Sequence, residues 1–207
     1  MPLNTRFLKE LSDLFVDDLK RSDYYRTLPK NEQRDLDDRL ATDAAEGLFP
    51  LLPGAEEEEL QRLLQAIHEK LHIQLPATVV DILRQVDGFA ENGVSLYGVD
   101  AEFRDDQFDS GPGLLAENLV NWSSFPETMQ KYLFVGDSDL WRFAVELATG
   151  GPVALHKATL KQAHRFSTVE ELVNDMMQQA LGDFGDETEN PEDEPGNHFT
   201  GFHFSSN

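Results

Sequence analysis

The chain contains no cysteine. This absence excludes a disulfide framework, a thiolate zinc site and a cysteine nucleophile. Apolar runs are also short, and none approaches the roughly 18 residues that a membrane-spanning helix needs. The first turns carry Asp and Glu where a secretory signal would have an apolar stretch. These absences predict a soluble cytoplasmic protein that has no membrane partner.

Basic residues are scarce as well. The 207 residues include 17 Lys and Arg against 39 Asp and Glu, which gives a formal net charge of -22. Such a field repels nucleic acid and anionic membranes, and it attracts basic partners. We therefore predict a protein partner and no nucleic-acid partner. A surface that serves only solubility is the open alternative, because net charge informs about association and not about fold.

Apolar residues at helical spacing predict four helices before Gly88. They cover residues 5–20, residues 31–48, a segment from near Ala55 to the residue before Pro76, and a segment from Pro76 to Asp87. After Gly88 the apolar runs shorten, which predicts a strand at Gly93–Tyr97, a loop at 98–113 and a short helix or turn at Leu114–Trp122. A hairpin follows at Tyr132–Val135 and Trp141–Leu147, with a third strand at Val153–His156. A Ser167–Glu170 capping box opens a last helix that ends near Leu181.

Three parts follow from this layout. Residues 1–54 form a helical N-terminal extension, and residues 55–182 form an α+β domain with helices packed on one face of a mostly antiparallel sheet. Residues 183–207 are acidic and rich in Gly and Pro, and they contain no Lys or Arg. That composition predicts a disordered tail. Within it, three aromatic side chains could dock on the domain: Phe199, Phe202 and Phe204.

His68-Glu69-Lys70-Leu71-His72 matches the H-E-x-x-H string, which places two zinc ligands on one face of a helix beside a general base. A zinc hydrolase built on His68, Glu69 and His72 is therefore an alternative. Against it, both His lie on the polar flank of an apolar stripe, and no third ligand follows in a recognisable context. No nucleophile elbow, phosphate-binding loop or dinucleotide fingerprint occurs. We predict no catalytic residues, no metal and no cofactor.

Several segments together resemble the SUKH superfamily, the Smi1/Knr4-like proteins and the bacterial toxin-immunity proteins related to them. The resemblance covers roughly residues 50 to 182, and its motifs are packing and turn signals. They are Leu75-Pro76, the apolar series from Val79 to Val86 with Asp87-Gly88, the turn Phe134-Val-Gly-Asp137 into Trp141–Leu147, Gly150-Gly-Pro152, and the helix Thr168–Met177.

This resemblance implies an α+β fold and a bacterial immunity protein that binds a cognate toxin domain, often a nuclease, and blocks it. A scaffold or regulatory adaptor of the same fold is the alternative role. Because loops on a rigid scaffold concentrate binding residues, we predict that the partner contacts the loop from Asp100 to Asp109, with the hairpin turn as a second candidate. The predicted partner-binding residues are Asp100, Glu102, Asp105, Asp106, Asp109, Asp137 and Asp139.

Overall fold

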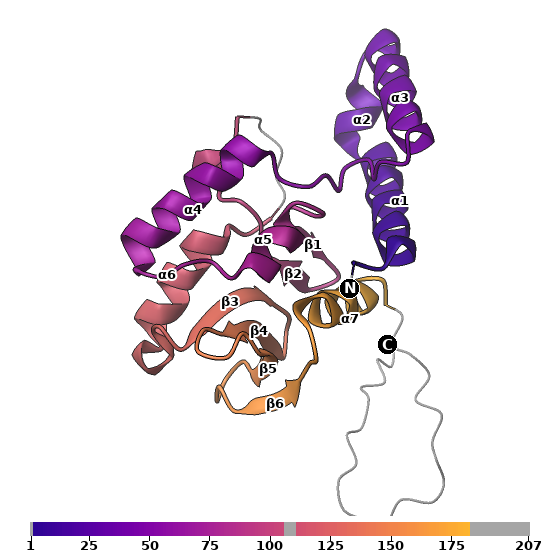
Figure 1. Cartoon of the computed structure of the whole chain (residues 1–207). Helices are drawn as coiled ribbons and strands as arrows, with labels where there is room; N and C mark the ends of the chain where they lie inside the picture. The colour runs from indigo at the N-terminus through magenta and orange to yellow at the C-terminus, as the bar shows by residue number, and fades with distance from the viewer. Residues whose placement is uncertain (1, 106–110, 183–207) are drawn as a thin grey trace, which may run out of the picture.

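The computed structural model describes residues 2–105 and 111–182. The chain has an α+β fold with a helical N-terminal region, as the sequence predicted. Figure 1 shows the helices around one sheet. The helices are α1 (Thr5–Arg21), α2 (Asp23–Thr27), α3 (Lys30–Ala45), α4 (Glu57–Leu71), α5 (Ala77–Leu83), α6 (Leu114–Ser124) and α7 (Val169–Ala180), with short 3-10 turns η1 (Ala101–Phe103) and η2 (Pro126–Thr128).

The sheet is a six-stranded antiparallel meander in which each strand pairs with its neighbours in sequence. The strand β3 carries a register shift between Phe134 and Gly136. A Cβ at Gly136 would collide with the Ser95 carbonyl and the Met176 methyl, so only glycine lets β2 and α7 approach this closely. The strands are β1 (Phe89–Glu91), β2 (Val94–Leu96), β3 (Tyr132–Asp137), β4 (Trp141–Glu146), β5 (Pro152–His156) and β6 (Gln162–Arg165).

The helix α6 completes the edge of β3 where β2 ends. The strand β2 pairs with β3 only at Gly136 and Asp137. Beyond that point the Phe134 N–H donates to Asn118 Oδ1 at 2.8 Å, and Asn118 Nδ2 donates to the Phe134 carbonyl at 2.7 Å. Trp122 Nε1 donates to the Tyr132 carbonyl at 2.9 Å. These side chains satisfy buried backbone groups that would otherwise lack a strand partner.

The helix α7 packs against β2, β5 and α5, and five of its apolar side chains are 0–1% exposed. The predicted C-terminal helix is therefore present, but its capping box begins one residue later than predicted. Thr168 Oγ1 accepts from the Glu171 N–H at 3.1 Å, and Glu171 Oε2 accepts from the Ser167 N–H at 2.7 Å. Both bonds satisfy N–H groups that the helix itself leaves free. The five side chains at 0–1% exposure are Leu172, Val173, Met176, Met177 and Ala180.

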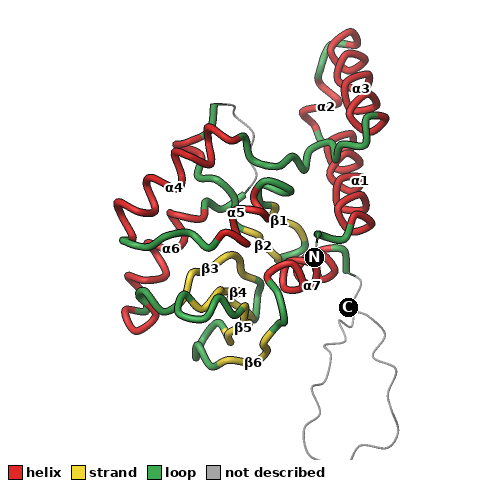
Figure 2. The backbone as a smooth tube through the Cα atoms, in the orientation of Figure 1, coloured by secondary structure: helices red, strands yellow, loops and turns green. Residues whose placement is uncertain are grey.

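The N-terminal helices form an arm, residues 5–45, whose base belongs to the main core. Leu8 and Leu11 are buried in the same apolar cluster as the sheet, and α1 packs against α7. The helices α2 and α3 extend away from the sheet (Figure 1). Residues 46–56 return from the arm to α4 as loop (Figure 2). This return is anchored where Ser12 Oγ donates to the Pro50 carbonyl at 2.6 Å.

Within the described ranges, no helix is long and apolar enough to cross a membrane. The predicted boundary between residues 54 and 55 stays a prediction. The predicted tail, 183–207, lies outside the described residues, and so do Phe199, Phe202 and Phe204.

Candidate functional site

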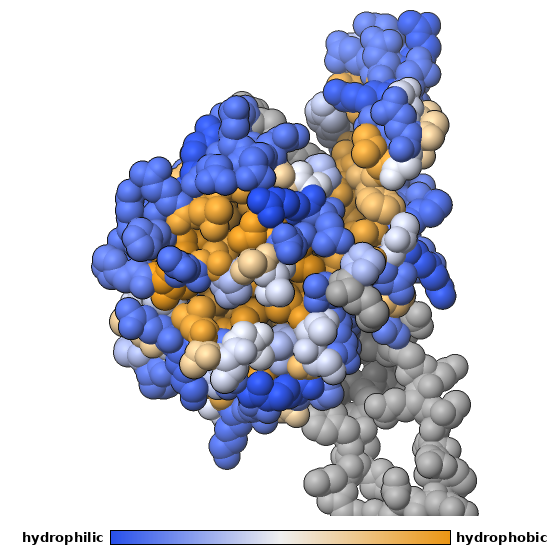
Figure 3. All heavy atoms as spheres, in the orientation of Figure 1, coloured by the Kyte–Doolittle hydropathy of each residue, from blue (hydrophilic) through white to orange (hydrophobic). Residues whose placement is uncertain are grey.

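An acidic surface lies where α4 meets η1. The helix α4 opens with a run of carboxylates, and this placement is favourable because the free N–H groups of a first turn carry partial positive charge. Figure 3 shows hydrophilic residues covering this part of the molecule. We call this surface the acidic face, and we define it by its exposed carboxylates: Glu56, Glu57, Glu58, Glu69, Glu102 and Asp105.

Two predicted binding residues, Glu102 and Asp105, are attached to α4 by ion pairs. Arg62 donates from both terminal nitrogens to the two Asp105 oxygens, at 2.9 and 2.7 Å. This guanidinium lowers the pKa of the Asp105 carboxyl. Lys70 Nζ lies 3.2 Å from Glu102 Oε1. The Asp105 N–H also donates to the buried Glu59 at 3.0 Å. The contacts of Glu102 and Asp105 therefore fix this segment on α4.

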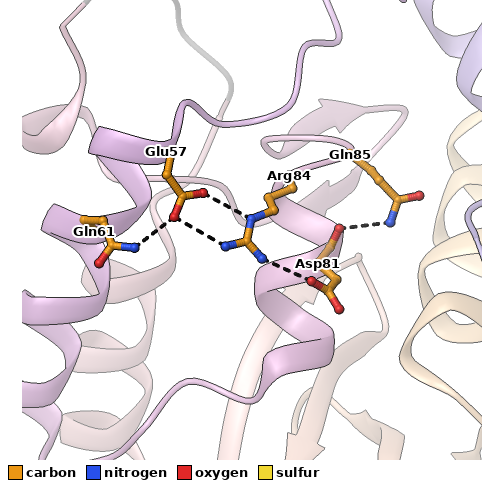
Figure 4. A network of polar contacts seen from close by, with 5 residues as sticks. All are labelled: Glu57, Gln61, Asp81, Arg84 and Gln85. Atoms are coloured by element: carbon orange, nitrogen blue, oxygen red, sulfur yellow. Dashed lines mark hydrogen bonds and ion pairs between the residues drawn. The ribbon is translucent and has the colours of Figure 1, made fainter.

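A third cation of this surface is held in the same way (Figure 4). Arg84, the C-cap of α5, bridges Glu57, at 3.2 Å, and Asp81, also at 3.2 Å. Gln61 Nε2 donates to Glu57 at 2.8 Å. The Arg84 guanidinium is the main reason why the pKa of Glu57 is lowered. Arg62, Lys70 and Arg84 are thus all paired with carboxylates.

Glu56, Glu58 and Glu69 are exposed and form no ion pair with any residue of the described ranges. The acidic face therefore has an excess of carboxylates over cations. Fixed carboxylates on one helix create a local negative potential that favours a cationic ligand.

Asp100 does not belong to this surface, which corrects its prediction as a partner-binding residue. It is 6% exposed, and its carboxylate accepts from the Leu115 N–H at 2.9 Å and the Ala116 N–H at 2.8 Å. Asp100 thus caps the first turn of α6, although it lies far from that helix in sequence. Burial raises the pKa of its carboxyl, and the two N–H donors oppose that effect.

Beneath the face, a buried ion pair that the sequence did not predict joins Asp87 to Arg104. Their side chains are 2% and 5% exposed. Asp87 Oδ1 also accepts from the Val99 N–H at 2.6 Å, and Arg104 Nε donates to the Val99 carbonyl at 3.2 Å. The pair holds the segment after β2 against the end of α5. In the sequence, Asp87-Gly88 indicates only the end of a helix. No local pattern indicates that Asp87 pairs with Arg104.

The hairpin turn between β3 and β4 makes different contacts. Asp137 Oδ2 lies 2.6 Å from Lys157 Nζ, and Asp139 is exposed. A Cβ at Gly93 would lie 3.4 Å from Asp139 Oδ2, so this turn lies beside the β1–β2 turn. The structure therefore brings Glu102 and Asp105 together on α4 and places Asp137 and Asp139 at a separate turn. Asp106 and Asp109 lie outside the described residues.

A second polar cluster surrounds Arg142 of β4. Its guanidinium carbon lies 5.1 Å from the Phe125 ring centre and 5.9 Å from that of Phe134, and one terminal nitrogen donates to Asn121 Oδ1. Its Nε is buried and has no hydrogen-bond partner among the described residues. Burial also raises the pKa of the nearby Glu117 carboxyl. The cluster joins α6 to the sheet.

The H-E-x-x-H string does not form its zinc-binding helix. The helix α4 ends at Leu71, and His72 is its C-cap with a φ of 56° in the left-handed region. His68 and His72 are both exposed. In residues 2–105 and 111–182, no group of three or more His, Cys, Asp or Glu could hold a metal ion. The geometric premise of the zinc alternative is therefore not met.

Comparison of the sequence with protein-family models and with curated proteins gives no match. The resemblance to the SUKH superfamily therefore rests on the residues quoted above.

Proposed function

We propose that the chain is a non-catalytic cytoplasmic binding protein of the SUKH type that neutralises a basic toxin domain, of the nuclease class, by direct contact. The observation that carries this proposal is the acidic face. Its cations are already paired, and Glu56, Glu58 and Glu69, on α4 and its N-cap, have no ion-pair partner among residues 2–105 and 111–182. A nuclease must hold phosphate, so its cleft is basic and complementary to this face.

The exposed pairs of the face allow exchange with a partner. The Lys70 and Glu102 side chains are 48% and 59% exposed, and those of Arg62 and Asp105 are 42% and 68% exposed. Exposed ion pairs contribute little to stability because water screens them. A toxin Lys or Arg can therefore replace Lys70 or Arg62 at small free-energy cost. The long-range field of the chain would also speed the encounter.

The experiment is a titration against the toxin domain encoded beside this gene, with a growth assay for protection. Glu56→Lys, Glu58→Lys and Glu69→Lys are combined, because none of these side chains forms an ion pair with a described residue. We expect binding to weaken at least about tenfold, mainly through slower association at low salt. The control combines Asp38→Lys, Glu46→Lys and Glu127→Lys, which are exposed residues outside the face.

The two triple variants change the net charge equally, so a difference in their affinities depends only on where the substituted residues lie. Equal weakening by both would show that the whole field acts and that the acidic face is not the interface. Tight binding by both, or a neighbouring toxin domain that is not basic, would contradict the proposal.

A scaffold or adaptor role is the second candidate, and the projecting arm favours it. An adaptor would bind its partner through the arm and would give no protection against a toxin. The growth assay separates the two roles, because only an immunity protein restores growth when it is expressed with the toxin domain.

A further inference from the structure

A groove lies on the arm between α2 and α3, away from the acidic face. Glu32, Asp35, Leu36 and Arg39 of α3 line one side, and they share one stripe of that helix by their spacing of three and four residues. Tyr24 and Leu28 line the other side. Figure 3 shows hydrophobic side chains interrupting the hydrophilic surface of the arm.

The groove has an apolar floor that solvent reaches. Tyr24 is 64% exposed, the largest value among the exposed large hydrophobic side chains of the described residues, while Leu28 and Leu36 are half-buried. The neighbouring Tyr25 has the opposite orientation, and its hydroxyl donates to Asp37 Oδ2 at 2.7 Å. Tyr25 therefore joins the two helices, whereas no hydrogen bond of the described residues involves the Tyr24 side chain.

Polar contacts fix the walls of the groove. Gln33 Nε2 donates to the Tyr25 and Leu28 carbonyls, both at 3.0 Å. Lys20 Nζ lies 3.1 Å from Asp37 Oδ1. These contacts hold α2 against α3 without the Tyr24 side chain. Tyr24→Ala should therefore leave the two helices in place. An exposed aromatic ring on a preformed surface is the kind of side chain that dominates the binding energy of protein interfaces.

The charge of the groove favours a basic segment of another protein over a second copy of this chain. The rim carries two carboxylates, Glu32 and Asp35, against one guanidinium, Arg39. A second copy of the chain would bring the same rim and a further net charge of -22. Like charges across an interface oppose association. A basic segment of another protein is attracted by both the rim and the overall field.

We propose that this groove binds a segment of a partner protein in which an apolar side chain is flanked by Lys or Arg. The apolar side chain packs on Tyr24, Leu28 and Leu36, and the cation pairs with Glu32 or Asp35. This site is separate from the acidic face. It would give the chain a second partner.

The probe is a phage-displayed random peptide library selected on the full chain, followed by anisotropy titration with the enriched peptide. We expect enriched sequences to place an apolar residue beside Lys or Arg. Tyr24→Ala should weaken the peptide at least about tenfold, which corresponds to about 1.4 kcal/mol. Leu140→Ala is the matched control, because it removes another exposed apolar side chain (47% exposed) at the β3–β4 turn.

The combined change Glu32→Lys and Asp35→Lys should weaken the same peptide, with a larger effect at low salt than at high salt. Circular dichroism checks that each variant keeps its helices. The proposal would be overturned if the selected peptides lacked an apolar residue beside Lys or Arg, or if the enriched peptide bound wild type and Tyr24→Ala with equal affinity. A concentration-dependent dimer that Tyr24→Ala abolishes would also overturn it, in favour of a second copy. Toxin binding by Tyr24→Ala tests the acidic face separately, because that face contains no arm residue.

Discussion

Asp87 and Arg104 form an ion pair that the fold buries almost completely, with 2% and 5% of their side chains exposed. Asp87 follows α5, whereas Arg104 follows η1, so one contact joins the end of a helix to the segment that carries Glu102 and Asp105. The acidic face thus depends on a charge pair that no partner can reach. The core therefore positions its two predicted binding residues, Glu102 and Asp105.

We predict that Arg104→Ala lowers the free energy of unfolding by about 3–5 kcal/mol, because it leaves the Asp87 carboxylate buried without its cation. Urea unfolding followed by tryptophan fluorescence measures this change. Lys9→Ala is the control, since it breaks the Lys9–Asp13 pair, whose side chains are 69% and 65% exposed. The control should leave the midpoint nearly unchanged. A midpoint for Arg104→Ala equal to that of the control would show that the buried pair contributes no stability.

A second prediction concerns pH. Burial raises the pKa of Asp100 above its ordinary value of 3.8. The folded state therefore binds this proton more tightly than the unfolded state. The stability that this group contributes is fully present below the ordinary pKa and is lost as the pH rises through the raised folded pKa. Wild type should thus gain stability relative to Asp100→Asn as the pH falls through that window.

Urea midpoints of wild type and Asp100→Asn across the acidic range test this prediction. Comparison with the single variant cancels the contribution of Asp175, whose pKa is also raised by burial. A difference between the two proteins that does not vary with pH would mean that Asp100 titrates alike in the folded and unfolded chain.

Much of the fold was predictable because local patterns determine it. The helical spacing of residues 5–20 and the capping residues near Thr168 are signals within one or two turns. The strand β6 escaped prediction because its four residues are all exposed, so no alternation marks it. The strand β1 escaped because Phe89–Glu91 is short and adjoins the Asp87-Gly88 turn.

The candidate site was predictable only in part. Composition identified an acidic surface, and Glu102 and Asp105 do lie on it. Asp100 has the same residue type in the same loop, yet it is buried as the cap of α6. A sequence shows that a carboxylate is present, but tertiary contacts decide whether it faces water. The ion pair of Arg62 with Asp105 spans 43 residues, and no local pattern indicates it.

The base of the arm gives a third prediction. Leu11 of α1 is 0% exposed and belongs to the same core as the sheet. We expect Leu11→Ala to lower the unfolding free energy of the whole domain by about 2–5 kcal/mol, the range for removing a buried leucine side chain. Leu48→Ala, at a position that is 56% exposed, is the control and should change little. Two separate unfolding transitions, with only one shifted by Leu11→Ala, would instead make residues 1–54 an independent unit.

The two histidines of the H-E-x-x-H string should respond oppositely to glycine. His72 adopts a φ of 56°, which glycine tolerates better than a residue with a Cβ. His72→Gly should therefore raise the unfolding free energy by about 0.5–1 kcal/mol. His68 is exposed inside α4, so His68→Gly should lower it by about 1 kcal/mol through helix propensity. Thermal and urea unfolding measure both changes.

A zinc site makes a different prediction for the same variants. If His68 and His72 held zinc, both substitutions would release the metal and destabilise the protein, and chelator would lower the melting temperature of wild type alone. Elemental analysis of purified protein and melting with and without chelator therefore complete the test. One zinc per chain together with loss of stability in His72→Gly would overturn the assignment of His72 as a helix cap. Opposite signs for the two variants and no effect of chelator would support that assignment, because a backbone effect depends on φ and a metal site depends on both imidazoles.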